Sequence, residues 1–197
     1  MKNLIVVDIQ PEYAKCFGYN LWVETVKKIK KAKRVCFYYV DFNCESPSFR
    51  NEDSEEYTGI VNYLYEAGLS DRMYEKITFV PKTYGFLRNQ MDVGIDDDLI
   101  VKQLKLMLKH KVSDSYQLFD NYTHYESGVK RQLTLLKNAE QDVTMHDLFV
   151  PSFDTDILSQ FQGAELIGGG RNECLAEMSL FMQAINVRHK IDRKSVV

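Results

Sequence analysis

The 197-residue sequence has no apolar run long enough to span a bilayer, and it begins without the basic and long apolar regions of a secretory signal peptide. Its four cysteines form neither a CxxC pair nor a Cys/His group with the spacing of a metal site. The net charge of −3 gives no basis for binding nucleic acid or an anionic membrane. These absences predict a cytoplasmic protein with free thiols, no metal and no cofactor.

The sequence does contain enough apolar residues, 45%, to bury the core of one domain. Short apolar runs alternate with segments of helical periodicity. Strands are predicted at 3–7, 34–40, 77–80, 164–167 and 189–197, with further short strands at 116–119 and 147–150. Helices are predicted at 19–33, after Ser54, after 96–98, within 121–142, around 154–161 and after the glycines at 168–170. This alternation predicts a three-layer α/β/α fold with a mostly parallel, Rossmann-like sheet.

Residues 164–186 read AELIGGGRNECLAEMSLFMQAIN, which predicts a strand, a glycine-rich turn and a helix. One face of that helix carries Leu175, Met178, Phe181, Met182 and Ile185. Cys174 falls in its first turn, where free N–H groups and the helix dipole lower the pKa of a thiol. The stretch predicts a nucleophilic cysteine. The alternative is a small buried cysteine at a tight contact between strand and helix.

Two further candidates follow predicted strands. Asp8 comes directly after NLIVV, and Lys82 comes two residues after ITFV. Each has an ordinary alternative, because an aspartate at a strand end often caps the next turn and a single lysine usually lies at the surface. In a parallel sheet, however, the carboxyl ends of the strands meet at one edge. Asp8, Lys82 and Cys174 are therefore predicted to lie together.

Aspartate, lysine and cysteine form a coherent set for nucleophilic catalysis. The carboxylate acts as a base for the thiol, the ammonium group stabilises developing negative charge, and the thiolate attacks. Backbone N–H groups of the glycine-rich turn and of the helix start would hold an oxyanion.

Three segments resemble motifs of the isochorismatase-like cysteine hydrolase superfamily. VVDIQPEY is similar to that family's first strand with its Asp-x-Gln, KTYGF to its lysine and aromatic segment, and LIGGGRNECLAEM to its turn and nucleophile helix. The resemblance implies a catalytic triad of Asp8, Lys82 and Cys174, with a thioester intermediate. It also implies an oxyanion hole formed by the N–H groups of Gly170 and Cys174, a cis peptide bond at Gly169-Gly170, and a homo-oligomer.

The sequence departs from the family in two places. The interval between Lys82 and Cys174 is longer than the resemblance implies, which predicts an inserted or rebuilt region at about 92–161 within a single domain of residues 1–197. Asp41-Phe42-Asn43 stands where metal-dependent nicotinamidases have Asp-x-His. The histidines form no pair at ligand spacing, and they are His110, His124, His146 and His189. The departures argue against metal-dependent nicotinamidase activity.

Two other functions are consistent with parts of the sequence. A metal-dependent nuclease resembling PIN or NYN domains would use Asp8, Asp92 and the cluster Asp96–Asp98 as ligands, although that cluster is also explained as a helix start. A non-catalytic relative would bind a metabolite or a partner protein in the same cleft. A structure in which Cys174 lies away from Asp8 and Lys82 would favour this last interpretation.

For a hydrolase, the partner is a small-molecule substrate. Residues flanking Asp8 and Lys82 are expected to line its pocket, namely Gln10, Tyr13, Phe17, Tyr84, Phe86 and Arg88. Aromatic walls with one arginine suit a small planar or carboxylate-bearing ligand.

Overall fold

The computed structural model describes residues 2–13, 15, 18–41, 54–82, 91, 94, 96–110 and 155–196. Within them, five parallel strands form one sheet in the order β3-β2-β1-β4-β5. The strands are β1 (Leu4–Val7), β2 (Val35–Val40), β3 (Ile77–Lys82), β4 (Ala164–Gly168) and β5 (His189–Val196). The predicted α/β fold class is therefore confirmed.

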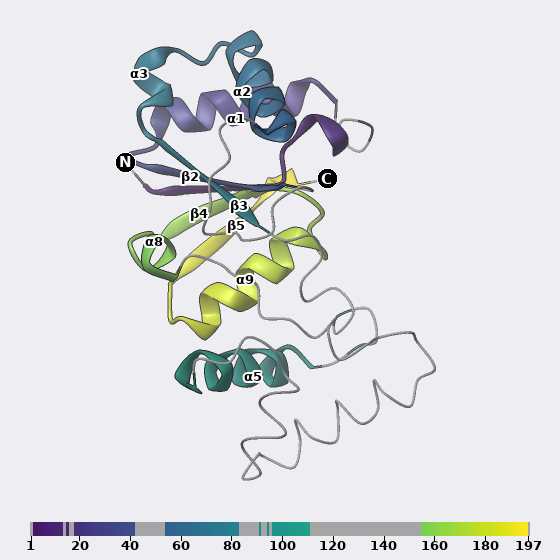
Figure 1. Ribbon diagram of the computed structural model, residues 1–197, viewed down its shortest axis with the longest axis vertical. Helices are drawn as coiled ribbons and strands as arrows, with labels where there is room; N and C mark the ends of the chain where they lie inside the picture. Colours follow the sequence, from purple (N-terminus) through teal and green to yellow (C-terminus); the bar gives the residue numbers. More distant parts are fainter. Residues whose placement is uncertain are drawn as a thin grey trace.

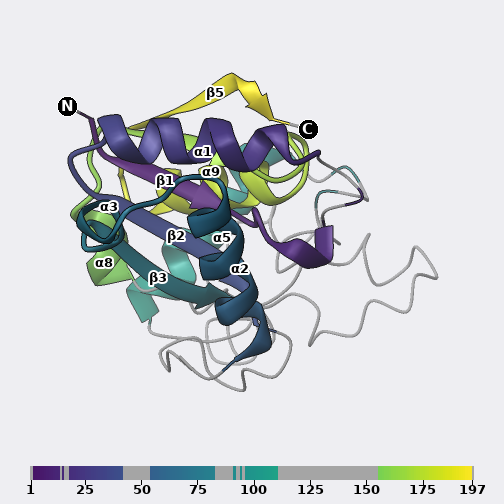
Figure 2. The same cartoon turned by 90° about the horizontal axis from the view of Figure 1, so that it is seen from above.

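Helices cover both faces of the sheet (Figures 1 and 2). One face carries α1 (Asn20–Lys31) and α2 (Glu55–Glu66), with the short α3 (Asp71–Tyr74) after α2. The opposite face carries α9 (Cys174–Ala184), and α5 (Asp97–His110) packs on the far side of α9. The single turn η1 (Pro11–Tyr13) follows β1, and α8 (Thr155–Ser159) precedes β4.

Strand residues alternate between two hydrophobic cores, as the pleat of a sheet requires. Leu4 and Val6 pack under α1 with Trp22, whereas Ile5 and Val7 pack under α9 with Phe181. All four residues of β1 and all six of β2 are buried. Their continuous apolar runs are typical of inner strands of a parallel sheet, which are covered on both faces.

Five of the predicted strands fall within the described residues, and their bounds agree with the observed ones to within a few residues. Strand β3 extends further than predicted and includes Lys82 itself. Pro81 is tolerated there because β3 is an edge strand. The strands predicted at 116–119 and 147–150 and the helix within 121–142 lie outside the described residues. In the described chain, no helix combines the length and apolarity needed to cross a membrane.

Helix α9 differs from its prediction. Only one apolar face was expected, but residues on nearly all sides of α9 are buried, Leu180 and Ala184 included. The reason is that α9 lies between the sheet and α5, so that both faces of the helix are covered (Figure 1).

Candidate active site

The order in which the chain adds strands to the sheet reverses between β1 and β4. The chain runs outward from β1 to β2 and β3, and then continues on the other side of β1 with β4 and β5. In open α/β sheets, ligands bind beyond the carboxyl ends of the strands at such a point. Two segments begin there: one starts at Asp8, directly after β1, and the other is the glycine turn that starts at Gly168, the last residue of β4.

The ends of β1 and β4 approach each other too closely for a side chain at position 168. Gly168 has φ +118°, and a Cβ atom there would lie 2.1 Å from the carbonyl oxygen of Val7. The next residue, Gly169, donates its N–H to the same carbonyl at 2.8 Å. Glycine is therefore required at 168, and its close approach brings the turn against the end of β1.

Asp8 stands in a strained backbone conformation. Its φ of +52° lies in the left-handed region, which a non-glycine residue rarely occupies, and its side chain is buried. The left-handed residue interrupts the alternation of β1, which would otherwise direct the side chain after Val7 toward α1. Residues held in such conformations cluster at functional sites, because the surrounding structure must offset the strain.

Lys82 reaches Asp8 across an intervening strand. The two residues belong to β3 and to the end of β1, with β2 between them, so that the strands are separated by about 9–10 Å. Only a long side chain spans that interval, and the Lys82 Nζ atom lies 2.9 Å from Oδ2 of Asp8. Both side chains are almost fully buried, at 2% and 1% exposure.

The charge of Lys82 is held by its surroundings. Burial by itself lowers the pKa of Lys82, but electrostatic interaction with Asp8 above all, and also with Glu177, more than offsets this and raises the pKa above its ordinary value. Lys82 is therefore an ammonium group at neutral pH.

Cys174 is the first residue of α9 and is a half-buried free thiol. Burial, the negative charge of Asp8 and hydrogen bonding to that carboxylate raise the pKa of Cys174, and Lys82 opposes the shift only in part. The expected lowering of the pKa at the helix start is therefore wrong. Desolvation and two neighbouring carboxyl groups disfavour the thiolate, and the resting group is the neutral thiol.

The turn before Cys174 leaves two backbone donors available. Gly170 uses its carbonyl to accept from the N–H groups of Glu173 and Leu175, at 3.0 and 3.3 Å. Within the described part of the chain, the N–H groups of Gly170 and Cys174 donate to no backbone carbonyl. These are the two groups assigned by resemblance to an oxyanion hole.

The cis peptide bond expected at Gly169-Gly170 is not present, because every peptide bond among the described residues is trans. The positive φ of Gly168 supplies the sharp change of direction instead. Gly169 then passes close to the thiol side chain, since a Cβ atom at 169 would lie 3.0 Å from Cβ of Cys174.

Gln10, predicted to bind substrate, holds two strand ends together. Its amide Nε2 donates to the carbonyl of Val40 at 3.1 Å and to Glu12 at 3.0 Å, while its Oε1 accepts from the N–H of Val40 at 2.8 Å. The side chain is fully buried. It ties the segment after Asp8 to the end of β2, and thereby positions Asp8.

The other predicted pocket residues are only partly described. Tyr13 is the last residue of η1 and is half-buried. Phe17, Tyr84, Phe86 and Arg88 lie outside the described residues. Of the region 92–161, the structure describes α5, α8 and a few residues beside them.

Glu177 was missed by the sequence analysis. It is one helical turn after Cys174, is 1% exposed, and its charge acts on both Cys174 and Lys82. A signal was present in the sequence: a helix that is apolar on all sides is predicted to be buried all round, and its acidic residue with it.

The carboxylates proposed for a metal-dependent nuclease do not gather in the described chain. Asp8 is paired with Lys82, and Asp96, Asp97 and Asp98 lie exposed at the start of α5. The N–H of Asp98 donates to Oδ1 of Asp96 at 2.9 Å, as in a helix cap. Asp92 lies outside the described residues, and the described ones contain no group of three His, Cys, Asp or Glu side chains suited to a metal ion.

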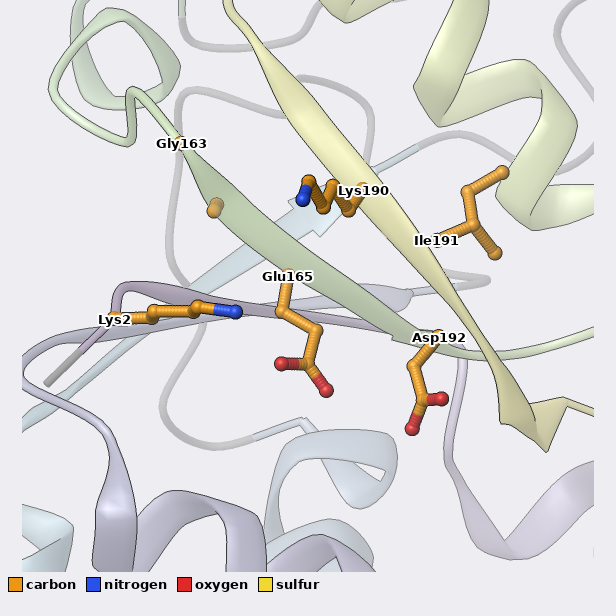
Figure 3. Close-up of a pocket in the computed structure, with 7 residues that line it drawn as sticks. Lys2, Gly163, Glu165, Lys190, Ile191 and Asp192 are labelled. Atoms are coloured by element: carbon orange, nitrogen blue, oxygen red, sulfur yellow. The ribbon is translucent and has the colours of Figure 1, made fainter.

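Two cavities among the described residues lie apart from Asp8 and Lys82. One, of about 260 Å³, is at the amino ends of β4 and β5 (Figure 3). Its carboxylates, Glu165 and Asp192, both pair with Lys28 of α1. The other, of about 450 Å³, lies beside α9 and β5 and includes the hydrogen-bonded pair Ser179 and His189.

Comparison of the chain with protein-family models, with curated proteins and with solved structures finds no match.

Proposed function

We propose that the protein is a cysteine-dependent hydrolase that cleaves an amide or a related bond of a small molecule. The observation that carries this proposal is the buried Asp8–Lys82 ion pair with the Cys174 thiol beside it at the carboxyl edge of the sheet. Asp8, Lys82 and Cys174 come from three distant parts of the chain, and each is the residue type that one step of such a reaction needs. The resemblance to isochorismatase-like hydrolases supports the same assignment.

In the first half of the reaction, the sulfur of Cys174 attacks the substrate carbonyl while Asp8 accepts the thiol proton. The raised pKa of Cys174 requires a base at this step, because little thiolate exists beforehand. The carbonyl oxygen becomes an oxyanion, which the N–H groups of Gly170 and Cys174 hold. The carbon–nitrogen bond then breaks, the amine takes the proton from Asp8, and a thioester remains on Cys174.

In the second half, water replaces the amine. Asp8 accepts a proton from the water as its oxygen attacks the thioester, and the sulfur–carbon bond breaks. Cys174 recovers its proton from Asp8, and the carboxylic acid leaves. Lys82 stays charged throughout and stabilises the negative charge that appears on the sulfur and on the oxyanion.

Selective alkylation tests the proposal. Iodoacetamide should label Cys174 faster than the three other cysteines, because Asp8 accepts the thiol proton as the sulfur attacks. Asp8→Asn should therefore slow this labelling by at least about tenfold, the low end of a general-base contribution. Asp71→Asn, at an aspartate that bonds an exposed tyrosine, is the matched control. Incubation with p-nitrophenyl acetate should also leave an acetyl group on Cys174, seen by mass spectrometry of the intact protein. Equal, slow labelling of all four thiols, with no acetyl adduct, would refute a nucleophilic Cys174.

The homo-oligomer implied by the resemblance and the cytoplasmic setting inferred from the free thiols stay predictions. Light scattering after size-exclusion chromatography measures the first. A mass equal to that of one 23.0 kDa chain would contradict it.

A further inference from the structure

The buried Asp8–Lys82 pair has a second carboxyl group beside it. Glu177 and Cys174 lie three residues apart on α9, a spacing that places their side chains on neighbouring parts of one helix face. Glu177 is 1% exposed, as is Asp8, and Lys82 is 2% exposed. A carboxylate is seldom fully buried unless a positive charge or a set of hydrogen bonds stabilises it there.

The groups that act electrostatically on Lys82 come from two elements. Asp8 contacts it from the end of β1, and Cys174 and Glu177 belong to the buried helix α9. The proposed reaction neutralises one of them, because Asp8 carries the thiol proton while the tetrahedral intermediate exists. A buried lysine without a negative neighbour tends to lose its proton. Lys82 would then fail at the stage where its charge is needed.

We propose that Glu177 is a positioning residue that keeps Lys82 protonated while Asp8 is neutral. This role rests on the proposed hydrolase mechanism, in which Asp8 alternates between its two protonation states. Glu177 is a buried residue of α9, the helix that lies between the sheet and α5. It acts through Lys82, whereas Asp8 exchanges protons with the reacting atoms.

The charge state of Lys82 tests this proposal directly. Lysine labelled with ¹³C at Cε reports protonation by NMR, and the variant Lys82→Arg assigns the signal. The samples are the wild type, Asp8→Asn, Glu177→Gln and the double variant. Asparagine at position 8 imitates the protonated carboxyl group and, of the uncharged residues, tolerates the left-handed backbone well.

We expect Lys82 to stay charged at neutral pH in both single variants and to become neutral in the double variant. A buried lysine without carboxylate partners titrates at about pH 5–6 in documented cases. Asp8→Asn combined with Glu173→Gln is the matched control, because Glu173 belongs to the same helix start but is exposed. That control removes the same total charge and should leave Lys82 charged.

Two results would overturn the role of Glu177. A neutral Lys82 in Asp8→Asn alone would show that Asp8 holds the proton unaided, and a charged Lys82 in the double variant would show that other groups hold it. If circular dichroism shows that the double variant does not fold, Glu177→Gln decides. Its Lys82 signal must titrate at a lower pH than in the wild type, and an unchanged titration refutes the proposal.

The same samples separate this inference from the proposed function. Alkylation of Cys174 that is indifferent to Asp8→Asn would refute the hydrolase mechanism, whatever the charge of Lys82. If Asp8→Asn slows the alkylation of Cys174 as expected, but the NMR spectra give either of the two results that contradict the role of Glu177, then that role alone is refuted and the hydrolase mechanism stands.

Discussion

Replacing Lys82 by methionine removes one partner of a buried ion pair and keeps most of the length of the side chain. In the native protein the Lys82 Nζ atom is 2.9 Å from Asp8, and solvent reaches neither group. The variant leaves the Asp8 carboxylate buried without the ammonium group that faces it. This situation is more costly than losing both charges together, because the remaining charge keeps its desolvation penalty.

The expected loss is about 3–5 kcal/mol of unfolding free energy, as for other buried pairs with one partner removed. Domains of this kind have about 5–15 kcal/mol in total, so the variant should lose a large share of its stability. Lys27→Met is the control. Lys27 pairs with Glu24 on the surface of α1 at 2.7 Å, but both side chains are more than half exposed. Lys27→Met should therefore lose less than about 1 kcal/mol of unfolding free energy.

The effect depends on pH in a defined direction. The raised pKa of Lys82 in the folded state means that its stabilising contribution is complete below the unfolded value of about 10.4, and is lost as the pH rises through the folded value. The difference in unfolding free energy between the wild type and Lys82→Met should therefore be constant around pH 7–8. It should narrow in strong alkali, where the wild type loses the pair as well.

Urea denaturation followed by circular dichroism measures the free energies, with Asp8→Asn and the double variant completing a cycle. The double variant should be more stable than the sum of the single losses predicts, by at least about 1 kcal/mol, because it does not leave the Asp8 carboxylate buried without its ammonium partner. A loss below about 1 kcal/mol for Lys82→Met would refute the reasoning. It would show that the pair is screened by solvent, as surface pairs are.

Three further predictions follow from the site. The rate of Cys174 alkylation in the wild type should keep rising above pH 9, because burial and Asp8 raise the pKa of that thiol, and a plateau near pH 8 would contradict this. Gly168→Ala should destabilise the protein by several kcal/mol in urea denaturation, because the new Cβ atom would lie 2.1 Å from a carbonyl oxygen of β1. Gly163→Ala is the control: its φ is +71° but no atom lies within 4 Å of the new Cβ, so it should lose only about 1–2 kcal/mol of unfolding free energy. Equal losses in the two variants would exclude the steric cause. Gln10→Ala should lose about 1–3 kcal/mol by the same measurement, since buried backbone groups at the end of β2 lose their partners, and a neutral effect would show that water replaces the amide.

Part of the site could be predicted because its positions follow from local patterns. Asp8 and Lys82 come at the ends of apolar runs, Cys174 comes at the start of a helix, and parallel strands bring such ends to one edge. The ion pair between Asp8 and Lys82 agrees with that expectation. None of this required knowledge of side-chain packing.

The state of the thiol could not be predicted in the same way. Helix position alone implies a low pKa for Cys174, whereas burial and the carboxyl groups of Asp8 and Glu177 raise it. Desolvation and charge proximity depend on which groups meet in three dimensions, and neither is a property of the sequence near position 174. The burial of Glu177 likewise depends on tertiary packing, because α9 lies between the sheet and α5.

The sequence by itself determined the fold class and the five strands with described residues, and it singled out Asp8, Lys82 and Cys174 as candidate site residues, because apolar periodicity and strand ends are local properties. The tertiary structure alone decided how these groups are held. The left-handed backbone at Asp8 and the close approach of Gly168 to β1 both arise from packing between strands that lie far apart in the chain. Packing between distant segments also sets the charge of Lys82 and the neutral resting state of Cys174, because only the folded chain brings Asp8 and Glu177 to them.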